Sequence, residues 1–518
     1  MALAKVAAKF AIIWLLSILW PSSAAPIKTT SKVAVDASDW SHRSIYQVVT
    51  DRFALDDGST PSCGLRDYCG GTWKGIENQI DYITGMGFDA IWISPVIHNL
   101  EENTTWGYSY HGYWGDDPSR LNNHFGTSDD LRSLSKAIHD RNMLLMVDVV
   151  INHLALNQDP AAIDNSHLPE PFNQSTAFHS NCPINYEDQA SIEDCWLVDS
   201  QPPLLADVNT ENSDVFNAMV QSVVELVQDY SIDGIRLDTA RHVPQRYLTQ
   251  FQEAVKVFVT GEVLHGEVDY VSQYQGPLSS VLNYPLYFTA TEVFTGKDTF
   301  HKLVTTINNE RALFPDATIL TNFVDNHDQP RFASMTGNNI TYDTNAATFL
   351  MLTTGIPIVY YGFEQRLDGA ADPENRKPLW SAGYDTNTPL YQLLSRLNTI
   401  RTLARSYDAP VPFDSTFSQV LAVADTQMGF QRGPLIVALT NADSDDGQTP
   451  IFAREDNSAM TGMGLITPDY PPGVDLFDML GCTMMVTTGA RGRFTVPRDS
   501  GPYVFAPKDL AAKICPDI

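Results

Sequence analysis

The chain has 518 residues, of which 43% are hydrophobic, and this length is enough for a large core and more than one domain. Asp and Glu total 62 against 33 Lys and Arg, so the formal net charge is −29. This acidic balance excludes nucleic acid and anionic membranes from the expected partners, because both are bound through basic surfaces. A neutral polymer such as a polysaccharide has no such requirement.

The first 25 residues have the pattern of a secretory signal peptide. Lys5 and Lys9 precede an apolar run at 10–20, and small residues follow at 22–25. The run is about half as long as a helix that spans a bilayer, and no other stretch approaches the roughly 20 apolar residues required. We therefore expect a secreted, extracellular protein with no membrane partner after cleavage of this peptide.

Short apolar, β-branched runs alternate with amphipathic segments through the first four fifths of the chain. The runs predict eight strands, at 44–53, 88–96, 143–151, 232–238, 257–263, 281–287, 318–324 and 356–361. The segments between them predict helices at 74–86, 128–142, 213–230, 244–256, 299–313 and 345–354. Eight strands with intervening helices predict the α/β class and a (β/α)₈ TIM barrel.

Two regions depart from this alternation. About 60 residues rich in Pro, Asn and Asp separate His153 from Ser213, and a loop of that length is usually functional or a small domain. After about residue 410, short alternating runs at 417–424, 435–439 and 492–496 predict a separate β-sandwich domain. The expected organisation is a signal peptide (1–25), a barrel (26–153 and 208–410), an inserted loop domain (154–207) and a C-terminal all-β domain (411–518).

Six cysteines and three glycosylation sequons fit an oxidising, extracellular compartment. Six cysteines allow fifteen connectivities, and pairing of nearest neighbours is our prediction. The predicted disulfides are Cys63–Cys69, Cys182–Cys195 and Cys482–Cys515. Zinc is disfavoured because no CxxC pair or Cys/His ladder is present. The sequons, at Asn103, Asn173 and Asn339, predict N-glycosylation.

Three carboxylates, Asp238, Glu262 and Asp328, follow the fourth, fifth and seventh predicted strands. The C-terminal ends of parallel barrel strands meet at one face, so these acids are expected to converge. A pair of carboxyl groups is what glycoside hydrolysis needs, one to attack the anomeric carbon and one to protonate the leaving oxygen. Each acid alone could be a helix cap or a solvated loop residue, but the three together predict a sugar-cleaving site.

Basic side chains accompany these acids. Arg236 lies two residues before Asp238 and therefore on the same face of its strand, where its charge is expected to keep that acid ionised. His153 and His327 also follow strands and are expected to donate hydrogen bonds to sugar hydroxyls.

Seven sequence blocks together resemble a known family. They lie at 69–75, 107–114, 148–153, 185–189, 234–242, 261–263 and 323–328. With these blocks in this order, residues 38–515 resemble the secreted fungal α-amylases of glycoside hydrolase family thirteen. The resemblance implies that Asp238 is the nucleophile and Glu262 the general acid/base. It implies that Asp328 holds the sugar hydroxyls and favours the distorted ring.

The resemblance also implies residues that bind the glucan and a calcium ion. The glucan-binding positions are Tyr113, Trp114, His153, Arg236, Arg241, His242, His327, Asp372 and Arg376. Aromatic faces at such positions pack on the apolar faces of sugar rings. The calcium positions are Asn152, Glu193, Asp207 and His242, the last through its backbone carbonyl. An all-oxygen set of this kind suits a hard cation such as Ca²⁺.

Departures from the family pattern concern the leaving-group side and stability. Arg241 replaces the usual Lys and Asp325 the usual Glu, and an Arg is not equivalent to a Lys where geometry counts. These changes are expected to affect binding on the leaving-group side. Ser272 and Phe314 stand where close relatives have a further disulfide, and its loss is expected to lower stability.

The favoured hypothesis is a monomeric endo-acting α-amylase that hydrolyses α-1,4 bonds in starch, glycogen and maltooligosaccharides with retention. A glucan-transferring relative is the alternative, because it shares the chemistry and differs only in the acceptor. A catalytically silent glucan-binding protein is disfavoured, since all three acids are present.

Overall fold

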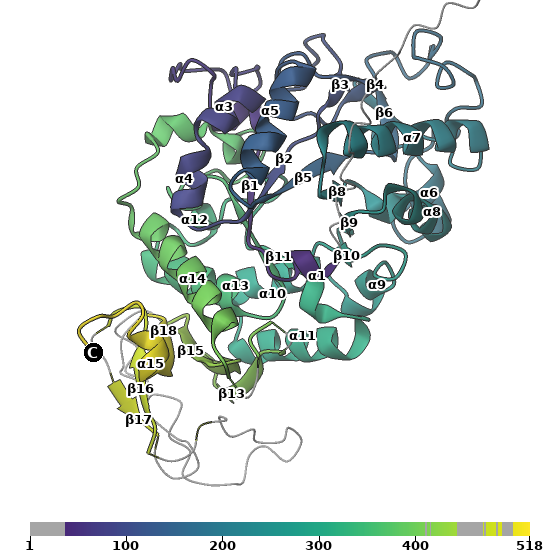
Figure 1. The fold of residues 1–518 in the computed structure, drawn as a ribbon. Helices are drawn as coiled ribbons and strands as arrows, with labels where there is room; N and C mark the ends of the chain where they lie inside the picture. Colours follow the sequence, from purple (N-terminus) through teal and green to yellow (C-terminus); the bar gives the residue numbers. More distant parts are fainter. Residues whose placement is uncertain are drawn as a thin grey trace, which may run out of the picture. The chain divides into compact units, whose positions relative to one another are not determined.

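The structure is a computed structural model that describes residues 37–409, 412–414, 416–442, 470, 473–482, 485–488 and 501–518. The predicted signal peptide at 1–25 and the predicted strand at 492–496 lie outside these residues. Figure 1 shows a ring of strands with helices outside it. Among the described residues, no helix has the length and apolar character needed to span a membrane.

Eight parallel strands form the central sheet, in the order β10-β9-β8-β5-β2-β1-β12-β11. They are β1 (Ile45–Val48), β2 (Ala90–Ile93), β5 (Leu144–Val149), β8 (Gly234–Leu237), β9 (Phe258–Gly261), β10 (Ser280–Val281), β11 (Thr321–Asn322) and β12 (Ile356–Tyr360). A parallel bridge between Leu282 and Thr321 joins the two edge strands. The predicted (β/α)₈ barrel is therefore confirmed. Seven of its eight strands lie inside predicted runs, and β10 begins one residue before its run.

The helices around the barrel begin at caps that the sequence supplies. Thr127 and Asp130 form a capping box at α5, and the Asn212 side chain accepts a hydrogen bond at the start of α7. The principal helices are α3 (Trp73–Asn78), α4 (Ile80–Gly85), α5 (Ser128–His139), α7 (Ser213–Tyr230), α8 (Gln245–Val255), α9 (Val268–Ser272), α10 (Tyr284–Phe294), α11 (Phe300–Leu313), α13 (Ile340–Leu352) and α14 (Pro389–Ser406). Shorter helices are α1 (Ala37–Trp40), α2 (Thr50–Phe53), α12 (Phe332–Met335), η1 (Ala240–His242), η2 (Ala317–Ile319), η3 (Glu374–Arg376) and η4 (Leu379–Ala382).

Several predicted elements were wrong in part. The run at 44–53 is a strand only at β1 and continues as the helix α2, and the helix expected at 345–354 begins at Ile340 and ends at Leu352. The strand expected at 281–287 ends at Val281, and Asn283 caps the helix α10 that follows it. Pro285 fits the first turn of a helix, whereas a central strand cannot accommodate a proline because it has no N–H to donate. The single helix expected at 74–86 is two short helices with Gln79 between them. The long helix α14 was not predicted.

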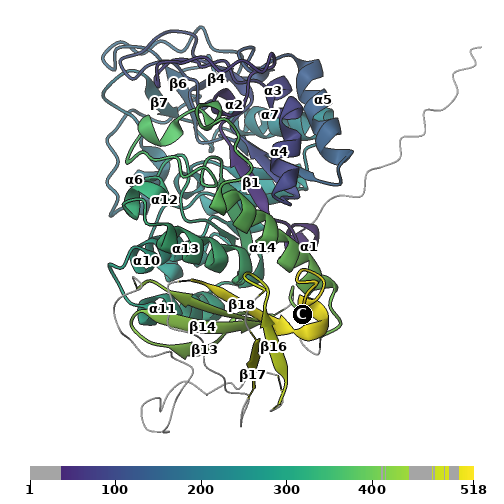
Figure 2. The same ribbon diagram turned by 90° about the vertical axis from the view of Figure 1, so that its left-hand side faces the viewer.

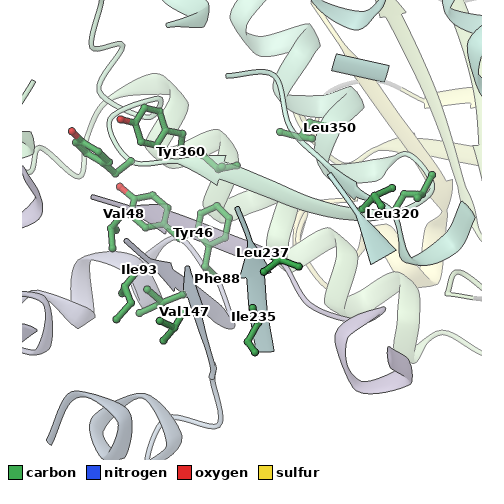
Figure 3. Packing of buried hydrophobic residues seen from close by; sticks show 14 of the residues in the cluster. Tyr46, Val48, Phe88, Ile93, Val147, Ile235, Leu237, Leu320, Leu350 and Tyr360 are labelled. Atoms are coloured by element: carbon green, nitrogen blue, oxygen red, sulfur yellow. The ribbon is translucent and has the colours of Figure 1, made fainter. Parts of the chain in front are cut away.

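Alternate side chains of each strand face opposite sides of the barrel wall. In β2, Ile91 and Ile93 belong to the large core between strands and helices, whereas Ala90 and Trp92 belong to a second, smaller cluster. Figure 3 shows part of the large core, with Tyr46, Ile93 and Val147 packed together. The second cluster also takes Leu144 and Met146 from β5, so its side chains fill the inside of the barrel.

The inserted segment after β5 begins with one strand and ends with another, and these two strands pair with each other antiparallel. β6 (His153–Leu156) pairs with β7 (Leu204–Asp207), with His153 opposite Asp207. Between them lie α6 (Gln189–Asp194) and the Cys182–Cys195 disulfide. A second pair, β3 (Ile97–Asn99) and β4 (Gly115–Leu121), brackets the loop at 100–114. The three predicted disulfides are all present.

The C-terminal region is an antiparallel sheet in the order β13-β14-β15-β18-β16-β17, which Figure 2 shows beside α11 and α13. Its elements are β13 (Gln419–Val423), β14 (Gln427–Arg432), β15 (Leu435–Thr440), β16 (Asp475–Asp478), β17 (Met485–Thr487), β18 (Tyr503–Pro507) and α15 (Lys508–Ala511). Thr440 donates to Asn345 of α13 at 2.9 Å, and Arg396 of α14 donates to the Met479 carbonyl at 2.6 Å. The predicted separate all-β region is confirmed.

Candidate active site

Strand alternation brings the charged residues to one place. Asp148 continues the inward-facing series of Leu144 and Met146 in β5, and it lies opposite Arg236 of β8 in the strand register. Asp238 and Glu262 come immediately beyond β8 and β9. Because side chains two residues apart share a face, these groups meet at the C-terminal mouth of the barrel.

Arg236 lies at the centre of this group and is fully buried. Its Nη1 is 2.5 Å from Asp238 Oδ1 and 3.0 Å from Asp148 Oδ1, and its Nη2 is 3.0 Å from Glu262 Oε2. Asp148 also accepts hydrogen bonds from the Tyr113 hydroxyl at 2.6 Å and from the Trp92 indole at 3.1 Å. One guanidinium therefore holds three carboxylates.

Glu262 is further fixed from the backbone. Thr239 donates its N–H to Glu262 Oε2 at 2.9 Å, and the Tyr284 hydroxyl lies 3.3 Å from Oε1. Thr239 has a φ of 47°, a left-handed conformation that is rare for a β-branched residue. Strain of this kind is typical of functional sites, and here it aims a backbone donor at the acid.

The electrostatics of the group differ from the expectation for an isolated Arg–Asp pair. Burial raises the pKa of Asp238, and the nearby Glu262 and Asp148 carboxylates raise it further against the opposing effect of Arg236. Burial likewise raises the pKa of Asp148. Arg236 contacts Asp238 but shares its charge with two other acids, so its effect on the pKa of Asp238 does not outweigh those of burial and the neighbouring carboxylates.

Asp328 stands apart from this group and has basic partners of its own. Its carboxylate lies 3.0 Å from His327 Nε2 and 3.2 Å from Arg376 Nη2. Although burial opposes ionisation, His327 and Arg376 together hold the pKa of Asp328 well below its ordinary value. Arg376 also pairs with Asp372 at 3.2 Å, which extends the charged surface along the cleft.

Histidines and a tyrosine near the acids are held in fixed positions by burial, stacking and hydrogen bonds. Burial lowers the pKa values of His153 and His242 to about 4, so both are uncharged at neutral pH. The Tyr113 ring stacks on His327 with centroids 5.0 Å apart, and Gln47 hydrogen-bonds His327 Nδ1 at 2.8 Å. Such fixed groups can orient sugar hydroxyls without reorganisation.

These residues line one cleft of about 430 Å³. Of the predicted site, it is lined by Asp238, Glu262, Asp328, Tyr113, Trp114, His153, Arg241, His242, His327, Asp372 and Arg376. The predicted site residue Arg236 is buried and is not among the lining residues. Prediction missed other lining residues, namely His111, Tyr186, Leu197, Leu205, Thr239 and Leu264, together with the supporting Trp92, Asp148 and Tyr284.

Some of the missed residues had a signal in the sequence. His111 and Tyr186 belong to blocks that carry the resemblance, and Asp148 begins another and shares the inward parity of Met146. Leu197 and Leu205 had none, because apolar loop residues resemble ordinary core.

Comparison with known proteins agrees with this geometry. The family model of the α-amylase catalytic domain matches residues 47–409. α-Amylase 1 of Schwanniomyces occidentalis is 41% identical over 92% of this chain and 92% of its own length, and the α-amylase of Saccharomycopsis fibuligera is 40% identical over 94% and 96%. The chain belongs to the α-amylase family. The predicted family, fold and enzyme class, an α-amylase-type glycoside hydrolase, are confirmed.

A solved α-amylase from Malbranchea cinnamomea has a TM-score of 0.86 at 39% identity, covering 92% of this chain and 99% of that one. A cyclomaltodextrin glucanotransferase, CldA, has a TM-score of 0.73 at 27% identity over 89% and 98%. The fold alone therefore does not separate hydrolases of the α-amylase family from transferases, whereas the two relatives described above, at 41% and 40% identity, carry the name α-amylase.

The two departures from the α-amylase pattern lie in different surroundings. Arg241 lines the cleft between two rings, with its guanidinium 5.4 Å from the Tyr186 centroid and 5.2 Å from that of Tyr270. Asp325 is buried away from the cleft lining and accepts a hydrogen bond from Phe332 N at 3.2 Å. An effect on the leaving-group side is therefore expected of Arg241 alone.

The positions of the missing disulfide lie at the ends of two helices. Ser272 ends α9 and Phe314 follows α11, and these helices are in contact, so a disulfide here would join them.

Three of the four residues that the α-amylase resemblance implies as calcium ligands converge. One terminal atom of the Asn152 amide lies 3.2 Å from both Asp207 Oδ1 and the His242 carbonyl oxygen. With the amide oxygen in that position, three oxygens face one another with no donor between them, which a hard cation would satisfy. With the amide nitrogen there, it donates to both. Glu193 instead accepts from Gln189 at 2.7 Å.

Across the described part of the chain, no three His, Cys, Asp or Glu side chains converge as a metal-ligand cluster. The Asn152 site uses an amide and a backbone carbonyl, so it falls outside that description. Of the predicted sequons, Asn103 and Asn173 are exposed, and Asn339 is half-buried and caps α13 by accepting from Thr341 N at 3.0 Å.

Proposed function

We propose that this protein is a retaining, endo-acting α-amylase that hydrolyses α-1,4-glucosidic bonds of starch, glycogen and maltooligosaccharides. The observation that carries the proposal is the single Arg236 guanidinium that binds both Asp238 and Glu262 at the mouth of the cleft. Carboxylates bound to neighbouring nitrogens of one guanidinium favour the roughly 5 Å separation of retaining enzymes over the roughly 6.5–9.5 Å of inverting ones.

In this mechanism Asp238 attacks the anomeric carbon as the bond to the leaving oxygen breaks, and Glu262 gives its proton to that oxygen. Arg236 holds Oδ1 of Asp238, and Oδ2 accepts no hydrogen bond from the described residues. Glu262 then takes a proton from water, which attacks the glycosyl-enzyme and releases Asp238. Two inversions restore the α configuration.

Asp328 and the neutral histidines act on the sugar. Asp328 stays ionised because His327 and Arg376 lower its pKa, so it can accept hydrogen bonds from ring hydroxyls through the reaction. The aromatic side chains Tyr113 and Trp114 give the cleft faces on which sugar rings pack.

The first sugar released should be the α-anomer. The proposed double displacement retains configuration, and mutarotation takes minutes, so proton NMR of the anomeric region in the first minutes of maltooligosaccharide cleavage gives the answer. An initial β-product would overturn the role of Asp238 as nucleophile. Products longer than the substrate would instead support the glucan-transferring alternative, which the α-amylase relatives do not favour.

We also propose that Asn152, Asp207 and the His242 carbonyl, together with Glu193 after a side-chain rotation, hold Ca²⁺. When bound, the ion would join the inserted segment at β7 to the barrel at η1 and so stabilise the wall that carries His242. The convergence of oxygens around Asn152 supports this site.

Removing calcium should lower the melting temperature by about 3 °C or more, since a ligand bound only to the folded state stabilises it by mass action. Calorimetry with and without a chelator measures the shift. Asp207→Ala should lose most of the response, whereas the exposed control Glu225→Ala should keep it. An equal response of both variants, or none in the wild type after verified metal removal, would argue against the site.

Secretion, glycosylation at Asn103, Asn173 and Asn339, and the domain limits 154–207 and 411–518 remain proposals. The three disulfides support an oxidising compartment. The β6–β7 pair at the two ends of the inserted segment supports its treatment as a domain. A monomer is proposed for the assembly.

A further inference from the structure

The cleft has two chemically distinct ends. Glu262, the proposed proton donor to the leaving oxygen, accepts a backbone hydrogen bond from Arg241 and so lies toward the leaving-group end. Asp328, which is proposed to hold the hydroxyls of the attacked sugar, is bound by Arg376, and Arg376 in turn binds Asp372, so this pair adjoins the non-leaving side. Asp372 is 48% exposed at its side chain, and a half-exposed carboxylate needs partners to keep one orientation.

A buried tyrosine supplies the second partner of Asp372. The Tyr110 hydroxyl donates to Asp372 Oδ1 at 3.0 Å, the same oxygen that Arg376 Nη1 approaches at 3.2 Å. Tyr110 is almost fully buried and is not part of the cleft lining. Burial raises the pKa of Tyr110 to about 12, so its hydroxyl remains a donor at any working pH.

The Tyr110 ring is itself braced by a buried arginine. The Arg52 guanidinium carbon lies 3.8 Å from the centre of the ring, a close cation–π contact. Arg52 has no exposed surface, and its Nη2 donates to the carbonyls of Leu65 at 2.8 Å and Asp67 at 3.0 Å. Both carbonyls lie in the loop that the Cys63–Cys69 disulfide closes.

We propose that Tyr110, braced by Arg52, is a positioning residue that fixes the pair of Asp372 and Arg376 for binding the glucan on the non-leaving side. Two donors on one carboxylate oxygen leave the other oxygen of Asp372 oriented toward the cleft for a sugar hydroxyl. The disulfide loop and the cleft are thus linked through side-chain contacts. This inference rests on the proposed function.

Tyr110→Phe removes only the hydroxyl and keeps the ring on Arg52. We expect KM for maltoheptaose to rise about 3- to 10-fold with kcat changed less than about 2-fold, because a hydrogen bond that orients a charged binding group is lost. The cleavage pattern of end-labelled maltoheptaose should also shift away from bonds that place many glucose units on the Asp372 side.

Tyr391→Phe is the matched control. It removes another buried tyrosine hydroxyl, one that donates to the Tyr82 carbonyl at 3.0 Å outside the cleft lining. It should lower stability by a similar amount and leave both KM and the cleavage pattern unchanged. If the two variants behaved alike in KM, the effect would be general destabilisation and the inference would be wrong.

A double-mutant cycle tests whether Tyr110 acts through Asp372. In an Asp372→Ala background, which removes the acceptor oxygens, Tyr110→Phe should raise KM less than about 2-fold further, because interacting residues are non-additive. Additive effects would overturn the inference.

Arg52→Lys tests the contribution of the cation–π contact. This variant keeps the charge but not the planar contact, and it should shift KM in the same direction as Tyr110→Phe. An unchanged KM would remove Arg52 from the proposal. A wild-type protein inactive on maltoheptaose would overturn the proposed function, whereas an active wild type with an unaffected Tyr110→Phe variant would overturn this inference alone.

Discussion

Asp238→Asn, Glu262→Gln and Asp328→Asn are each expected to lower kcat by at least about 10³-fold while the fold survives. Each change is nearly isosteric and removes a charge or a transferable proton that the double displacement requires. Kinetics on soluble starch, with circular dichroism of each variant, would test this. A variant that retains more than about a tenth of wild-type activity would remove that acid from the mechanism.

Stability should distinguish the three variants further. Asp238 and Glu262 share Arg236 with Asp148, so neutralising one of three crowded carboxylates should leave the melting temperature unchanged or raise it. Asp328→Asn loses pairs with His327 and Arg376 and should lower it slightly.

Asp325→Asn is the matched control for Asp328→Asn. Asp325 lies three residues earlier in the same segment and is buried, but it bonds the backbone of Phe332 and does not line the cleft. Its replacement should leave kcat within about 3-fold of wild type. A loss comparable to that of Asp328→Asn would show that activity at this segment depends on its folding rather than on the proposed role of Asp328.

The second large effect concerns Arg236. Among the described residues, Arg236 is the one cation that contacts Asp148, Asp238 and Glu262 together. Arg236→Met should lower the free energy of unfolding by about 3–5 kcal/mol at neutral pH. Leaving charges buried and unpaired carries this cost. Chemical denaturation of wild type and variant measures the difference, and kcat should fall with it because the acids lose their orientation.

The loss of stability in Arg236→Met should depend on pH in a defined direction. Burial already raises the pKa values of Asp238 and Asp148 in the folded state, and without Arg236 they rise further. An acid whose pKa is higher in the folded state binds protons on folding, so its contribution to stability falls as pH rises. The deficit of Arg236→Met against wild type should therefore shrink as pH is lowered from 8 to 5.

Arg432→Met provides the control for this pH dependence. Arg432 is also almost fully buried, but its partners are the backbone carbonyls of Phe413 and Thr353 and the Phe413 ring. Its replacement should lower stability by an amount that changes little between pH 5 and 8. An Arg236→Met deficit that is equally constant would show that the three acids do not share its charge.

Local sequence determined which residues reach the inner face of the barrel. Period-two alternation in β5 and β8 places Asp148 and Arg236 inward, and the position of Asp238 two residues after Arg236 continues the same face. The strand end carrying Glu262 was likewise readable, because an apolar β-branched run that stops at a carboxylate marks the end of a strand. These are short-range properties, and they are encoded within about ten residues. Asp328 lies in the loop after β11, which ends at Asn322.

The tertiary structure alone decided how the charges are shared and which side chains reach the cleft. That one guanidinium serves three carboxylates depends on neighbouring strands 88 residues apart in sequence. Asp325 and Asp328 look alike in the sequence, yet one binds a backbone amide in the interior and the other faces the cleft. The Tyr110 hydroxyl meets Asp372 across 262 residues. Such contacts depend on how the loops pack on the closed barrel, and no local sequence pattern predicts that packing.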